Sequence, residues 1–65
     1  MDPDACFAGL LDAIASGEAE AAHDHADNLL RWLDRGGFAP GGGKLRLSAV
    51  REFCSWVMTT YPREQ

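Results

Sequence analysis

The feature that most constrains this chain is the segment from Glu18 to Arg35, which carries one unbroken helical pattern. Its apolar residues recur at alternating steps of three and four, and they are Ala19, Ala22, Ala26, Leu29 and Leu33, with Leu30 beside them. At about 100° per residue they fall in one arc, which Ala21, His25 and Trp32 extend on one flank. Such an arc is wider than one antiparallel neighbour covers. The segment therefore predicts a helix that packs against two others, or against one other and a second chain.

The ends of this segment carry helix-boundary signals. Ser16 stands just before it, where a serine side chain can accept a first-turn N–H. Gly36 suits the left-handed position that ends a helix, with Phe38 placed to fold back on the last turn. Pro40 prevents the helix from continuing. These signals predict a helix over residues 18–35.

A first, shorter helix is predicted over about residues 3–15. Asp2 can cap it, and Pro3 suits the first helical position because proline loses no hydrogen bond there. Only a few residues separate this helix from the next, so the two should form an antiparallel hairpin. Its expected buried stripe consists of Phe7, Leu10, Leu11 and Ile14, with Cys6 at the edge.

A third helix is predicted over about residues 47–61, after a glycine-rich loop and before Pro62. Its expected buried side consists of Val50, Phe53, Cys54, Val57 and Tyr61. Trp56 lies off this stripe. A chain of 65 residues makes one domain of marginal stability. The predicted fold is therefore all-α, a three-helix bundle in which an antiparallel hairpin and a third helix form a single domain of residues 1–65.

Composition and cysteine usage indicate an ordinary globular chain, with 46% hydrophobic and 25% charged residues. No apolar run reaches the length of a membrane span, and the first residues lack the basic start and apolar core of a signal peptide. We therefore expect a cytoplasmic protein without a membrane partner. Cys6 and Cys54 lie within apolar faces, which favours buried free thiols over a disulfide between the first and third helices.

Charge is distributed unevenly along the chain, whose formal net charge is −4. The residues up to Leu30 hold seven acidic side chains and no Lys or Arg, whereas those from Arg31 onward hold six basic and three acidic ones. The negative net charge argues against a protein that binds nucleic acids in general. The asymmetry is consistent with attraction inside the monomer, and also with electrostatic docking or head-to-tail contact between chains.

The best metal-ligand pattern lies on the helix predicted over residues 18–35. Glu20, His23 and Asp27 are spaced three and four apart and share one side, and a Glu-x-x-His pair binds metals inside helical bundles. Such sites draw ligands from several helices, whereas the other two buried stripes are apolar. We therefore expect an exposed polar face and no cofactor.

No nucleophile stands paired with a base and an orienting group, so we also expect no enzymatic activity.

Aromatic residues outside the expected core suggest an interaction surface. Trp32 and Trp56 lie at the margins of their apolar stripes, and partly exposed tryptophans are enriched at protein interfaces. Each can instead cover the other's helix within the monomer. With His25 and Met58 they form the predicted surface, which we expect to serve a homodimer or another protein. A small non-catalytic interaction or self-assembly module is the favoured function.

The alternative surface is basic. Lys44, Arg46 and Arg51 lie at the start of the third predicted helix, where they can contact nucleic-acid phosphates. A helix-turn-helix needs its recognition residues on a helix that follows a short turn, but here the basic helix follows a glycine-rich loop. A small regulatory protein that contacts nucleic acid is therefore the alternative function.

Two segments resemble parts of known helical proteins. The helix ending LLRWLDRGGFAP resembles that of short uncharacterised bacterial helical proteins, to which no activity is attached. The segment AIASGEAEAAHDHADNLL is similar to the hairpins of tetratricopeptide-type repeats and of the helical effector domains of some bacterial transcription regulators. The metal-binding pattern of those effector domains has no residue-by-residue match here. The chain holds one hairpin and no second copy at a period of about 34 residues, which excludes a solenoid.

Overall fold

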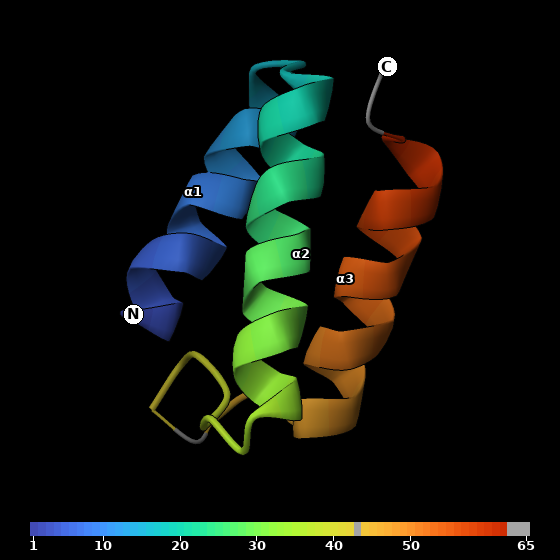
Figure 1. Cartoon of the computed structure of the whole chain (residues 1–65). Coiled ribbons are helices and arrows are strands. Elements are labelled where there is room, and N and C mark those ends of the chain that lie inside the picture. The colour runs from blue at the N-terminus through green and yellow to red at the C-terminus, as the bar shows by residue number, and fades with distance from the viewer. Residues whose placement is uncertain (43, 63–65) are drawn as a thin grey trace.

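The computed structural model describes residues 1–42 and 44–62, and within them the chain forms three α-helices (Figure 1). Helix α1 spans Pro3–Ala15, α2 spans Ala19–Asp34 and α3 spans Leu47–Thr60. Helices α1 and α3 run in the same direction, and α2 runs antiparallel to both (Figure 1). The all-α three-helix bundle is confirmed, and every observed helix end lies within one residue of its predicted position. Among the described residues, none of the helices has the length and apolarity that crossing a membrane requires.

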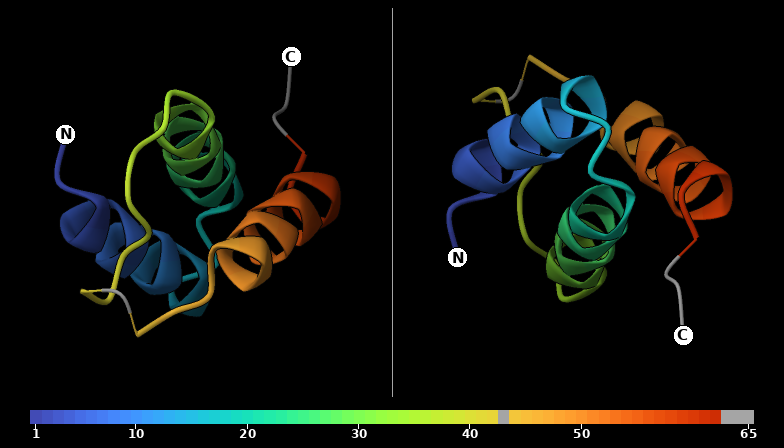
Figure 2. Two further views of the ribbon diagram at one scale, coloured as in Figure 1. Left: turned by 90° about the horizontal axis from the view of Figure 1, so that it is seen from below. Right: turned by 90° about the horizontal axis from the view of Figure 1, so that it is seen from above.

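Helix α2 is the central element of the bundle, and both α1 and α3 pack against it (Figure 2). Its buried residues occupy the predicted stripe and are Ala22, Ala26, Leu29 and Leu33. They join one hydrophobic cluster with buried residues of both neighbours, which are Leu10, Ala13, Val50, Cys54 and Val57. The prediction that this helix needs two neighbours is therefore confirmed.

Helix α1 approaches α2 through small residues. A Cβ atom on Gly9 would stand 3.0 Å from the imidazole ring of His25, so this ring lies directly against the glycine. The thiol of Cys6 donates a hydrogen bond to the His25 carbonyl oxygen at 3.3 Å. Ala13, one turn after Gly9, is 4% exposed. The side of α1 that packs most closely on α2 is thus its small-residue side.

The rotation of α1 about its own axis, which points its small residues at α2, differs from the rotation that its predicted buried stripe implies. Leu11, which we expected inside, is 46% exposed, and Ala13 takes a place in the core instead. Small residues permit a closer approach of two helix backbones than large ones do. The small residues of α1 face α2. Leu11 lies on the other side of Leu10 around the helix, so its side chain points into solvent.

Of the two side-chain caps predicted for the starts of α1 and α2, the first is confirmed and the second is corrected. The carboxylate of Asp2 accepts hydrogen bonds from the backbone N–H groups of Asp4 and Ala5, at 3.0 and 3.3 Å, and so caps α1 as predicted. Ser16 does not cap α2, because it ends α1 through its own backbone N–H. Helix α2 begins after Glu18, whose side chain makes no capping hydrogen bond.

The long loop between α2 and α3 is anchored to α1. Helix α2 is followed by Gly36 in the left-handed conformation, with φ 86°, as predicted. The loop then passes beneath the N-terminal half of α1 before it reaches α3 (Figure 2). Pro40 is fully buried, and the Gly41 N–H donates to the carboxylate of Asp4 at 2.6 Å. These contacts hold the loop against one end of the bundle.

Two neighbouring leucines test the observed rotation of α1. Leu10→Ala removes a fully buried side chain and should lower the free energy of unfolding by about 2–5 kcal/mol. Leu11→Ala changes a side chain that is 46% exposed and should cost less than about 1 kcal/mol. Urea denaturation followed by circular dichroism measures both values. Equal losses from the two substitutions would contradict the rotation.

Candidate interaction surface

A row of aromatic rings links α1 to α3. Phe7 of α1 meets Phe53 of α3 edge to face, with ring centroids 6.0 Å apart. Phe53 stacks on Trp56 at 6.0 Å, and Trp56 meets Tyr61 edge to face at 6.2 Å. We term these four residues the aromatic row. Such ring pairs stabilise one another beyond the area that they bury, and the Phe7–Phe53 pair is the one that joins the two outer helices.

The aromatic row is only partly covered by its own chain. Trp56 is 52% exposed, and Phe7 and Phe53 are half-buried. Leu11 follows Phe7 by one helical turn on the same flank of α1 and is also exposed. Large apolar side chains that gather on one face are typical of protein interaction sites. This part of the surface is therefore the best candidate for binding a protein.

The structure does not gather the four residues of the predicted interaction surface into one patch. Trp32 packs edge to face on Phe38 at 5.7 Å and donates its indole N–H to the Phe38 carbonyl oxygen at 3.0 Å. His25 lies against α1. Met58 is partly buried and packs against the core, so Trp56 alone of the four belongs to the aromatic row.

Sequence reasoning missed Leu11 as a surface residue, and did not include the half-buried Phe7 in an interaction surface, because both fall beside Leu10 on the helical wheel. Whether they face the core or the surface depends on the rotation of α1 about its own axis. That rotation is set by the contact between Gly9 and His25, which joins two different helices. The available signal was the group of small residues on the opposite flank of α1.

The predicted metal-ligand residues of α2 have separate surroundings. The imidazole Nδ1 of His23 lies 3.0 Å from the carbonyl oxygen of Tyr61 and joins α2 to the end of α3. Asp27 forms a salt bridge with Arg31 at 3.1 Å, and Glu20 is exposed. Within residues 1–42 and 44–62, no three or more His, Cys, Asp or Glu side chains are grouped so that they could hold a metal ion.

The basic residues near the start of α3 divide into one paired and two exposed side chains. Arg51 forms a salt bridge with Asp34 of α2 at 2.6 Å. This pair is one instance of attraction between the acidic and basic parts of the chain within the monomer. Lys44 and Arg46 are exposed at the end of the loop and the N-cap of α3.

Both cysteines are free thiols, as the sequence favoured. Burial, and to a smaller extent the neighbouring Cys6, raise the pKa of Cys54 from 9.0 to about 11. Burial also raises the pKa of Cys6. The thiolate is the reactive form of cysteine, and activated cysteines have lowered pKa values. Near neutral pH both thiols are therefore protonated in the folded chain.

The comparisons with known proteins do not add a function to this geometry. Comparison of the chain with protein-family models, with curated proteins and with solved structures gives no significant match.

The raised pKa of Cys54 predicts slow alkylation in the folded state. At pH 8 a pKa change from 9.0 to about 11 lowers the thiolate fraction about a hundredfold. Native Cys54 should therefore react with iodoacetamide at least that much more slowly than Cys54 in the urea-unfolded chain. Mass spectrometry of quenched, digested samples measures the two rates. Similar rates in the folded and unfolded chains would show that this thiol is not buried.

Proposed function

We propose that this chain is a small non-catalytic interaction module that self-associates through the aromatic row and Leu11. The observation that carries the proposal is the half-exposed Trp56, whose ring is positioned by contacts with Phe53 and Tyr61. A ring that is already positioned loses little side-chain freedom when a partner covers it. Tryptophan is also among the residues that contribute most to the binding energy of interfaces.

The direction of the helices and the charge distribution support a second copy as the partner. Because α1 and α3 are parallel, a two-fold axis along them would place α1 of one protomer against α3 of its partner (Figure 1). Asp4, near the start of α1, would then lie at the same end of the dimer as Lys44 and Arg46, which precede α3 of the partner. A two-fold axis across the helices would instead stack α1 on α1, which brings acidic residues together.

The size of the molecule limits the strength of this association. The Cα positions extend over 32 × 19 × 19 Å, so one long face offers an area of about 600 Å². Two such faces would bury about 1,200 Å² in total, which is the lower end for a specific interface. We therefore expect a dimer that dissociates on dilution, with a dissociation constant in roughly the micromolar range.

Replacement of Trp56 tests the proposed dimer. Trp56→Gln removes the most exposed ring of the row and should weaken association at least about tenfold. Sedimentation velocity over a range of protein concentrations measures the dissociation constant. Phe38→Gln is the matched control, because Phe38 is 67% exposed and lies outside the aromatic row. A monomeric wild-type chain at every concentration, or equal weakening by both substitutions, would refute self-association through this surface.

The same measurements separate this proposal from nucleic-acid binding. The exposed Lys44 and Arg46 are the residues that a nucleic acid would contact first. A chain that stays monomeric, yet binds random duplex DNA at low salt, would replace the proposed function with the alternative. In that case the double substitution Lys44→Gln and Arg46→Gln should abolish the binding, whereas Trp56→Gln should not.

A further inference from the structure

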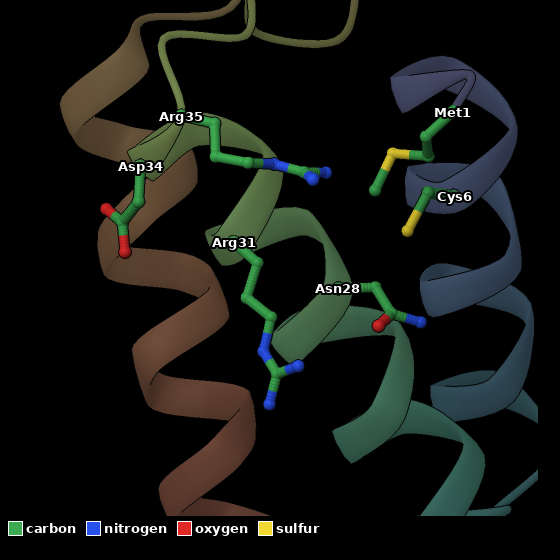
Figure 3. Close-up of a pocket in the computed structure, with 6 residues that line it drawn as sticks. All are labelled: Met1, Cys6, Asn28, Arg31, Asp34 and Arg35. Atoms are coloured by element: carbon green, nitrogen blue, oxygen red, sulfur yellow. The ribbon is translucent and has the colours of Figure 1, made fainter.

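A hollow lies away from the aromatic row, between the N-terminal end of α1 and the C-terminal half of α2 (Figure 3). It has a volume of about 620 Å³ and opens to solvent. The residues that line it are Met1, Cys6, Asn28, Arg31, Asp34 and Arg35. The hollow therefore combines an apolar wall from the start of the chain with polar side chains from α2.

The hydrogen-bond donors of the hollow come from one side of α2. Asn28, Arg31 and Arg35 are spaced three and four residues apart, which places them on a single stripe. The Arg35 side chain reaches across toward Met1 and the Asn28 side chain extends toward α1, whereas the Arg31 side chain points away from Arg35 (Figure 3). An arginine carries five N–H donors in a planar fork that matches a carboxylate. The stripe can thus present the Arg35 guanidinium group and the Asn28 amide to a ligand in the hollow.

The hollow keeps a net positive charge after its internal ion pairs are counted. Its acidic residue, Asp34, is neutralised by Arg51 at 2.6 Å. Arg31 pairs with Asp27 at 3.1 Å but remains largely exposed, so donors of its guanidinium stay accessible. Within the described part of the chain, Arg35 has no salt-bridge partner. Arg35 therefore contributes an uncompensated positive charge to the hollow, which favours an anion.

The opposite wall of the hollow favours an apolar group on that anion. It consists of the Met1 side chain and the sulfur of Cys6, whose thiol proton is directed to the His25 carbonyl oxygen. Thioether and thiol sulfur are soft, weakly polar surfaces. We propose that this hollow binds a carboxylate that carries an apolar group, with Arg35 holding the carboxylate. A free aliphatic acid and the C-terminal residue of a peptide share this chemistry.

Titration with small probes tests the site independently of self-association. Hexanoate added to the ¹⁵N-labelled chain should give saturable NMR shifts at Asn28, Arg31 and Arg35, with a dissociation constant of about a millimolar. Acetate lacks the apolar tail and should bind at least about tenfold more weakly, and hexylamine should not shift these residues. Peptides ending in leucine, with a free or an amidated carboxyl group, show whether a peptide terminus is accepted as well as a free acid.

Matched arginine substitutions identify the residue that holds the carboxylate. Arg35→Gln should weaken hexanoate binding at least about tenfold, because it removes the unpaired guanidinium of the hollow. Arg46→Gln makes the same charge change at an exposed position outside the hollow and should leave binding unchanged. Equal weakening by both variants, or no saturable shift with hexanoate, would overturn the proposal. Tighter binding of inorganic phosphate to the same three residues would also overturn it, because the site would then select a different anion.

Discussion

The fold depends on covering α2 from two sides at once. Its alanine and leucine stripe is continued by His25 and Trp32 on the flank that faces α1, and by Leu30 on the other flank. A helix of this length is marginal in isolation, so its stability comes from packing rather than from local hydrogen bonds. Helices α1 and α3 must therefore be present together for the hydrophobic cluster to be complete.

This arrangement explains why large apolar residues remain outside. A chain of 65 residues has too little interior to bury every large side chain once two helices have closed around α2. Helix α1 uses Gly9 and Ala13 for its closest contact, which leaves Phe7 and Leu11 on its other flank. Phe7 then meets Phe53 across the bundle. The aromatic row is thus a consequence of how α1 sits on α2.

The same packing separates two surfaces of different chemistry. The aromatic row joins α1 to α3, whereas the hollow lies between α1 and the C-terminal half of α2. Trp56 belongs to the first surface and Arg35 to the second, so a substitution at one leaves the residues of the other in place.

The sequence predicts those parts of the structure that depend on local residue patterns. The span of α2, the Asp2 cap and the left-handed Gly36 each depend on residues within one turn of one another, so periodicity and capping rules identify them. The rotation of α1 depends on Gly9 meeting His25 of another helix, which no local pattern records. For that reason the sequence placed Leu11 in the core, whereas the fold exposes it.

Amide hydrogen exchange tests most directly whether α2 is the element on which the rest depends. If two helices cover it at once, its amides from Ala22 to Leu33 should be the slowest to exchange in the chain, with protection that approaches the free energy of global unfolding. The amides of α1 and α3 should exchange faster, since each of these helices can separate from one side while the rest of the bundle persists. Exchange in α2 that is as fast as in α1 or α3 would contradict this account.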